Sequence, residues 1–243
     1  MVELDGAPRE HELPGAKGRM LFAYLVLNRE RTIERDELLM AVWGDDASPE
    51  TEAAMRVCLS KVRRALGPDR ISGKAQIGLV LPPNALIDVE AALEAIHEAE
   101  SHFALEEWGK AFMTCQTAES IAARPFLPGL DMPWIDRWRR RLDDVRVRGL
   151  ECHAAAALRL GGPALSLAEQ SARAVTELSP YRESGYAILM EALEGKGNIA
   201  EALRTYEAVR RLLREEMGVA PGPALQTRYL RLLDMADETT SPT

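Results

Sequence analysis

The spacing of hydrophobic residues divides the chain into two regions that meet near residue 88. Up to that point, short apolar segments alternate with Gly- and Pro-containing turns, whereas from Val89 onward the pattern is almost wholly helical and rich in Ala and Leu. Short connections between the later helices predict antiparallel neighbours. Helices are expected in this second region at residues 89–103, 106–122, 135–159, 165–178, 182–195, 199–217 and 222–235.

The first two helices of the N-terminal region are predicted at residues 19–28 and 35–43. Thr32 is a candidate N-cap for the second helix, because its hydroxyl can accept a hydrogen bond from a free backbone N–H. Trp43 is expected to be buried, and Gly44 then ends the helix.

A third helix is expected to begin near Ser48 or Thr51 and to end at Leu66. Its apolar positions from Met55 onward recur at spacings of four, three and four, which places them in one helical stripe. Gly67 follows directly and favours termination of the helix.

Short β-hairpins are predicted at both ends of the N-terminal region. Three helices followed by the second hairpin constitute a winged helix. The hairpins are expected at residues 2–4 with 10–13, around the turn-forming dipeptide Asp5-Gly6, and at residues 70–72 with 77–81, around residues 73–76.

The C-terminal region contains a weak internal repeat. Gly161 and Gly197 lie between paired helices and are 36 residues apart, close to the 34-residue period of tetratricopeptide (TPR) repeats. Ala168, Pro180, Ala202 and Tyr206 occupy positions similar to that consensus.

The predicted fold is therefore mainly α. An N-terminal winged helix-turn-helix with short β-hairpins is expected at residues 1–88, and a TPR-like all-helical domain at residues 89–236. The polar residues 237–243 are expected to form a disordered tail.

Charge distribution changes this picture at one place. The chain has a net charge of −8, and residues 1–90 carry 12 Lys or Arg against 15 Asp or Glu. Residues 51–67, by contrast, carry four basic residues and only one acidic residue, Glu52. A nucleic-acid-binding surface requires one basic face rather than a basic chain, so the third helix is the candidate. A denser basic run at residues 137–148 lies among aspartates and is interpreted as a solvated helix face.

Several classes of protein are disfavoured. The three cysteines are far apart, no Cys/His grouping has metal-ligand spacing, and neither a metal nor a cofactor is expected. Phosphate-binding, dinucleotide-binding and hydrolase motifs are missing from the sequence, so no catalytic residue is assigned and an enzyme is not expected. No apolar run approaches the roughly 20 residues of a membrane helix, and a cytoplasmic protein without membrane contact is predicted.

Four sequence segments resemble one bacterial family. They are residues 35–39 (RDELL) with 42–44 (VWG), residues 59–67 (LSKVRRALG), residues 197–206 (GNIAEALRTY) and residues 213–223 (LREEMGVAPGP). In this order they resemble the Streptomyces antibiotic regulatory proteins, which join an OmpR-like winged helix to a bacterial transcriptional activation domain. The resemblance extends from about Val2 to Leu233.

This resemblance implies a sequence-specific transcription regulator that activates a specialised gene cluster. Family members bind direct repeats in promoter DNA, oligomerise on the DNA and contact RNA polymerase holoenzyme. The implied partners are therefore double-stranded promoter DNA, RNA polymerase and further copies of the chain.

A winged helix inserts its third helix into the major groove, where Arg or Lys can read guanine. Arg56 and Ser60 share a helical face and are expected nearest the base edges, whereas Lys61, Arg63 and Arg64 are expected nearer the phosphates. The backbone at Thr51 is a further candidate for phosphate contact. Arg70 and Lys74 in the second hairpin complete the predicted DNA-binding residues.

Two alternatives remain open at this stage. The winged helix could have shifted from DNA to protein binding, since the chain is acidic and its second hairpin carries few cations. The helical domain could also receive a signal that controls the winged helix, in addition to mediating self-association.

Overall fold

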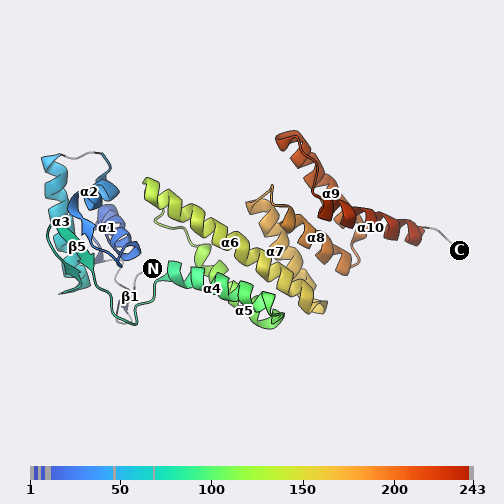
Figure 1. Cartoon of the computed structure of the whole chain (residues 1–243), viewed down its shortest axis with the longest axis horizontal. Helices are drawn as coiled ribbons and strands as arrows, with labels where there is room; N and C mark the ends of the chain where they lie inside the picture. The colour runs from blue at the N-terminus through green and yellow to red at the C-terminus, as the bar shows by residue number, and fades with distance from the viewer. Residues whose placement is uncertain (1–2, 5–6, 9–11, 46–47, 68, 241–243) are drawn as a thin grey trace. The chain divides into compact units, whose positions relative to one another are not determined.

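The computed structural model describes residues 3–4, 7–8, 12–45, 48–67 and 69–240, and these form two compact units (Figure 1). Unit 1 consists of Met1–Asp88 and Pro125–Arg141, and unit 2 consists of Val89–Arg124 and Leu142–Thr243. The segment Pro125–Arg141 lies in the part of the sequence for which a helical domain is predicted. Unit 1 therefore receives a contribution from outside the predicted winged-helix region.

Three helices form the body of unit 1: α1 (Gly15–Leu27), α2 (Arg35–Trp43) and α3 (Pro49–Leu66). The bounds of α2 are those predicted. Helix α1 begins four residues earlier than predicted, because Gly15 adopts a φ of +58° and Pro14 packs against Gly18, where a Cβ would lie 2.4 Å from the proline Cδ.

Thr32 is not the N-cap of α2, and this expectation was wrong. Glu34 occupies that position, because Ile33–Glu34 forms the short strand β3 immediately before the helix. The strand pairs with β5, so backbone pairing rather than a hydroxyl fixes where α2 begins.

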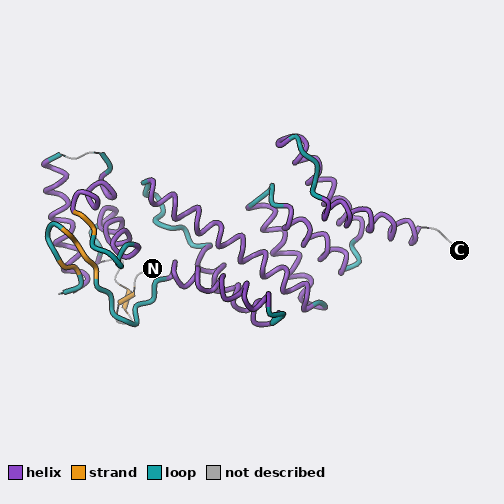
Figure 2. The backbone as a smooth tube through the Cα atoms, viewed as in Figure 1, coloured by secondary structure: helices purple, strands orange, loops and turns teal. Residues whose placement is uncertain are grey.

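The described residues of unit 1 form two small antiparallel sheets, drawn in orange in Figure 2. In the first, β1 (Glu3–Leu4) pairs with β2 (Ala7–Pro8), so the second strand precedes the predicted residues 10–13. Residues 5, 6, 10 and 11 lie outside the described residues. The second sheet has the order β3-β5-β4, with β4 at Ile71–Ser72 and β5 at Gln76–Leu79. Buried Ile33 and Ile77 face each other in its register, which anchors the second hairpin to the core.

The C-terminal end of α2 is capped from three directions. A helix leaves its last four carbonyl groups without internal partners. Here the Gly44 amide donates to Met40 O at 2.9 Å, Lys17 Nζ donates to Val42 O at 2.6 Å, and the indole N–H of Trp134 donates to Ala41 O at 2.8 Å.

Trp134 belongs to the start of helix α6 (Pro133–Leu160), and this start is part of unit 1. Its ring packs edge-to-face against Tyr24 with centroids 5.3 Å apart, and it is 6% exposed. Ile135 is fully buried in the same core as the side chains of α1, α2 and α3. The first turns of α6 are therefore an integral part of the winged-helix core.

The interpretation of residues 137–148 as a solvated basic face is wrong for several of its arginines. Arg139 folds back over the loop that precedes α6 and donates to three carbonyl groups, those of Phe126 (3.2 Å), Leu127 (2.8 Å) and Leu130 (2.7 Å). It also pairs with Asp136 at 3.0 Å. One guanidinium thus fixes a loop that lacks helix or strand hydrogen bonds of its own.

Unit 2 consists of antiparallel helices, most of which are joined by short turns. Gly161 and Gly197, at φ of +68° and +77°, lie at equivalent turns, and Ala168 and Ala202 are fully buried where paired helices pack. The predicted TPR-like architecture is confirmed. Besides the rest of α6, its helices are α4 (Asp88–Ala104), α5 (Trp108–Ala122), α7 (Leu165–Leu178), α8 (Glu183–Gly195), α9 (Ile199–Leu212) and α10 (Pro223–Thr240).

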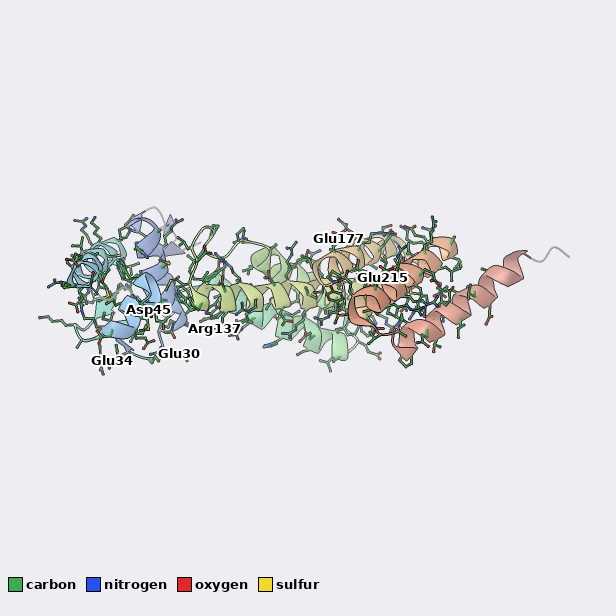
Figure 3. The ribbon with its side chains drawn as sticks, turned by 90° about the horizontal axis from the view of Figure 1, so that it is seen from above. Glu30, Glu34, Asp45, Arg137, Glu177 and Glu215 are labelled. Atoms are coloured by element: carbon green, nitrogen blue, oxygen red, sulfur yellow. The ribbon has the colours of Figure 1, made fainter. Side chains whose placement is uncertain are left out.

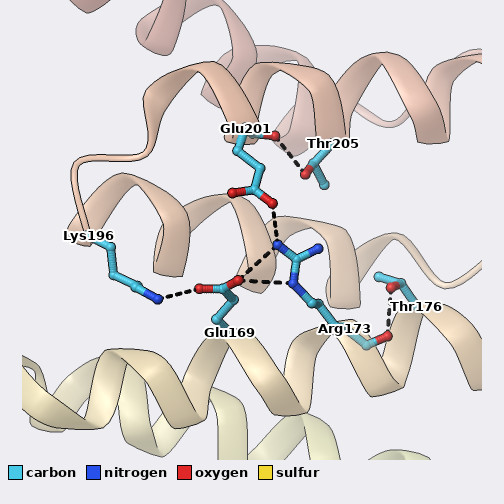
Figure 4. A network of polar contacts seen from close by, with 6 residues as sticks. All are labelled: Glu169, Arg173, Thr176, Lys196, Glu201 and Thr205. Carbon is cyan, nitrogen blue, oxygen red and sulfur yellow. Dashed lines mark hydrogen bonds and ion pairs between the residues drawn. The ribbon is translucent and has the colours of Figure 1, made fainter.

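A polar network connects three successive helical elements of unit 2 (Figure 4). Arg173 on α7 binds Glu169 on the same helix at 2.9 Å and Glu201 on α9 at 2.6 Å. Lys196, in the turn after α8, binds the other oxygen of Glu169 at 2.6 Å. The Glu169 side chain is only 16% exposed, so the network is better shielded from solvent than an isolated surface ion pair.

The last helix is longer than predicted. Helix α10 continues to Thr240, so residues 237–240 are helical rather than part of a disordered tail; residues 241–243 lie outside the described residues. Within the described part of the chain, no helix is sufficiently long and apolar to cross a membrane.

A buried histidine links α5, α6 and α7 in unit 2. His153 is 6% exposed, its Nδ1 lies 2.8 Å from Ser171 Oγ, and its ring stacks on Phe112 with centroids 4.2 Å apart. Its Nε2 is buried without a hydrogen-bond partner. Burial lowers the pKa of His153 below its usual value of 6.5, because the charged ring would lose its hydration.

This burial predicts that unit 2 loses stability in mild acid. Below about pH 6.5 the unfolded chain binds a proton at residue 153 that the folded unit does not, so the free energy of unfolding falls as pH decreases from that value. Urea unfolding between pH 8 and 5.5 measures the slope. In His153→Gln the slope should be smaller than in the wild type, and equal slopes would contradict the expectation.

Candidate nucleic-acid interface

The first turn of α3 is fixed by a capping box. Ser48 Oγ accepts a hydrogen bond from the Thr51 amide at 3.3 Å, and Thr51 Oγ1 accepts one from the Ser48 amide at 2.9 Å. Pro49 at the first helical position suits this start, because its missing N–H needs no partner there. Thr51 is consequently 9% exposed and its amide is already bonded, so the structure does not present it as a free phosphate contact.

The apolar stripe predicted for α3 is confirmed, since Met55, Leu59, Val62 and Leu66 are all buried. Four of the predicted DNA-binding side chains lie instead on the solvent-facing surface of the helix, which Figure 1 shows at the edge of unit 1. These exposed residues are Arg56, Ser60, Lys61 and Arg64.

Arg63 connects α3 to the second hairpin. Its Nη2 donates to Gly73 O at 2.6 Å, at the turn between β4 and β5. Lys74 follows at the exposed tip of this turn, and half-buried Arg70 precedes β4. The structure thus places the cations of α3 next to those of the hairpin, and the half-buried Arg63 lies between the two elements.

The hairpin turn requires glycine at position 73. Gly73 has a φ of +83°, and a Cβ there would lie 1.7 Å from Gln76 O. On the other side of the turn, Gln76 Nε2 donates to Glu34 Oε1 at 2.7 Å, which attaches β5 to the start of α2.

A cavity of about 440 Å³ lies beside α3, and sequence reasoning did not predict it. Trp43 is only partly buried and lines this cavity, contrary to the expectation that it belongs to the core. Lys17 lies over the Trp43 ring, with Nζ 5.5 Å from its centroid. Exposed Val57 and Lys61 on α3 also line the cavity.

Cys58 faces the same cavity from within α3. Burial raises the pKa of the Cys58 thiol, while the nearby charges of Lys61 and Lys17 act in the opposite direction. The thiol therefore stays protonated at neutral pH, and the electrostatic character of the cavity is set by the two lysines. Lys17 precedes the helix predicted from residue 19, which is why no sequence pattern pointed to it.

The arrangement is suited to binding a polyanion rather than to catalysis. Its cations project from one helix, one hairpin and the start of α1, and no acidic side chain is paired with Arg56, Lys61 or Arg64 among the described residues. In the same part of the chain, no group of three His, Cys, Asp or Glu side chains is placed to hold a metal ion.

Two family models match the chain. Residues 11–80 match "Transcriptional regulatory protein, C terminal", and residues 87–233 match "Bacterial transcriptional activator domain". The second match alone covers more than half of the chain, and together they cover both predicted regions.

Individual relatives agree with these models. The chain is 30% identical over 224 residues to the regulatory protein AfsR of Streptomyces griseus, covering 92% of this chain but 23% of AfsR. It is 27% identical over 232 residues to the regulatory protein DnrI of Streptomyces peucetius, covering 86% of this chain and 81% of DnrI. A solved structure of Mycobacterium tuberculosis EmbR with a low-affinity phosphopeptide has the same fold, with a TM-score of 0.80 and 23% identity over 94% of this chain and 61% of EmbR. The chain thus spans less than a quarter of AfsR and about three fifths of EmbR.

Proposed function

Because the chain belongs to the Streptomyces antibiotic regulatory protein family, we propose that it binds promoter DNA in a sequence-specific manner and activates transcription of a specialised gene cluster. The observation that carries this proposal is the exposed cationic surface of α3, which stands on a chain with a net charge of −8. A cationic face concentrated on the recognition helix is what binding to duplex DNA requires.

The side chains divide into two groups by their position. Arg56 and Ser60 lie one helical turn apart on the exposed surface and are assigned to base edges in the major groove. Lys61 and Arg64 are assigned to phosphates on either side of the groove.

Arg63 and Lys74 are assigned to the phosphates near the hairpin, where Arg63 also holds the turn through Gly73. The cavity supports one further phosphate contact, since Lys17, Lys61 and the indole of Trp43 converge on it. Phosphate contacts of this kind position the helix but do not select the sequence.

The TPR-like unit is assigned to contacts between proteins. We infer that it mediates oligomerisation on repeated promoter sites or contact with RNA polymerase holoenzyme, because stacked helix pairs present extended surfaces for other polypeptides. Such a regulator works in the cytoplasm, on chromosomal DNA.

Replacing Arg63 by alanine tests the DNA interface. The substitution removes one phosphate contact and the bond to Gly73, and it should weaken DNA binding by roughly 1–3 kcal/mol, about 5- to 150-fold. Mobility-shift titration against fragments of the promoters next to the gene, at one fixed salt concentration, measures the effect.

The matched control is Arg211→Ala, which removes the same charge from an exposed position of unit 2 and should leave DNA affinity unchanged. Wild-type affinity should also fall steeply with added salt, and the slope should be shallower for Arg63→Ala because fewer counterions are released. A salt-independent affinity, or equal affinities of Arg63→Ala and wild type, would refute the proposed interface.

A further inference from the structure

Three of the four arginines near the start of α6 are exposed and form no ion pair among the described residues. Arg139 clamps the preceding loop, and Arg148 binds Glu100 through two hydrogen bonds of 2.9 and 2.7 Å. Arg137, Arg140 and Arg141 form no ion pair with any described residue and are exposed. Their spacing of three and four residues places them on one face of the helix, and we call these three residues the arginine stripe.

Stabilisation of α6 does not explain the arginine stripe. The helix dipole favours cations in the last turn of a helix, and these residues lie instead in the second and third turns of α6. They also repel one another, and two of the aspartates that flank them in the sequence bind other arginines. Asp136 binds Arg139 at 3.0 Å, and Asp144 lies 3.7 Å from Arg148 and 4.0 Å from Arg182.

The arginine stripe belongs to unit 1 but lies apart from the recognition helix. The first turns of α6 pack on α1 and α2 through the contacts of Trp134 with Tyr24 and Ala41. In Figure 1, α1 and α2 lie between these turns and α3, and Figure 3 labels Arg137 beside the α6 ribbon. A straight DNA duplex bound to α3 would therefore not cover the arginine stripe, which would remain accessible to another partner.

We propose that the arginine stripe is a docking site for an acidic polypeptide segment. Each guanidinium presents a planar pair of donors that matches a carboxylate, and a row of three suits a segment with closely spaced Asp or Glu. Trp138 adds a partly buried ring beside Arg141, whose guanidinium lies over it, 5.0 Å from the centroid. The stacking restricts Arg141 before a partner arrives, which lowers the entropic cost of binding.

Binding of a fluorescein-labelled peptide of ten glutamates to the full chain tests this proposal by fluorescence anisotropy at low salt. The triple variant Arg137→Gln, Arg140→Gln, Arg141→Gln should raise the peptide Kd about tenfold or more, because it removes three uncompensated charges from one face. The control variant Arg159→Gln, Arg211→Gln, Arg214→Gln removes the same charge from exposed positions of unit 2 and should leave the Kd near that of the wild type.

A third variant separates the arginine stripe from the DNA interface. Arg56→Gln, Lys61→Gln, Arg64→Gln should lose duplex binding and keep most of the peptide binding, whereas the stripe variant should show the reverse. Equal peptide affinities of the stripe variant and wild type would overturn the proposal. So would a loss of duplex binding in a stripe variant whose circular dichroism is unchanged, because the arginine stripe would then be a DNA contact.

Discussion

Replacing Trp134 by alanine should lower the stability of unit 1 by roughly 3–5 kcal/mol, although the residue lies far along the chain from the winged helix. The substitution empties a site in the core, removes the edge contact with Tyr24 and leaves Ala41 O without its donor. Hydrogen exchange should show faster opening of α1 and α2, while α7 and α8 keep their protection. Measuring peptides from both units in one sample provides the comparison.

Two variants refine the result for Trp134. Trp134→Phe keeps most of the buried ring and loses only the N–H, so it should cost roughly 1–3 kcal/mol through the unpaired carbonyl of Ala41. Trp108→Ala removes a partly buried ring that packs against Phe103 in unit 2, and it should leave exchange of unit 1 unaffected. Wild-type protection of α1 and α2 in Trp134→Ala would show that the start of α6 does not support the winged helix.

Replacing Arg139 by alanine should cost roughly 2–3 kcal/mol and release the loop before α6. The change leaves the carbonyls of Phe126, Leu127 and Leu130 without the donor that they share. Because one guanidinium makes all three hydrogen bonds, the substitution removes them together. Limited proteolysis should then cleave between residues 124 and 132, where the wild type resists.

Arg139→Lys and Arg140→Ala are the informative comparisons for Arg139. Lysine keeps the charge but lacks the fork that reaches several carbonyls, so it should restore only part of the resistance. Arg140 is the exposed neighbour without an ion pair among the described residues, and its loss should leave the loop intact. Equal cleavage of Arg139→Ala and the wild type would show that Arg139 does not hold the loop before α6 in place.

The helices could be predicted largely because their signals are local. The bounds of α2 and of α7 follow from apolar spacing and adjacent turn residues. The strand β3 is only two residues long and exists because β5 pairs with it, so Thr32 was wrongly taken for a cap. Pairing partners distant in sequence leave no periodic trace in such a short segment.

The candidate site shows the same limit. Exposure of Arg56, Ser60 and Arg64 could be predicted, because the apolar stripe of α3 fixes which faces point outward. The burial of Thr51 and the lining of the cavity by Lys17 could not, because each depends on a neighbour that only the folded chain supplies. Arg139 is the clearest case, because nothing in the sequence distinguishes it from the exposed arginines beside it.

The link between Arg63 and the carbonyl of Gly73 has a consequence for retargeting the protein. The turn requires glycine at position 73, so its backbone path is fixed. The Arg63 side chain is held against that path by its hydrogen bond to Gly73 O. Libraries that seek a new operator should therefore randomise the freely projecting side chains of Arg56 and Ser60 and leave the Arg63–Gly73 pair untouched. Diversity introduced at that pair would misplace the hairpin against the groove before any new base preference could be selected.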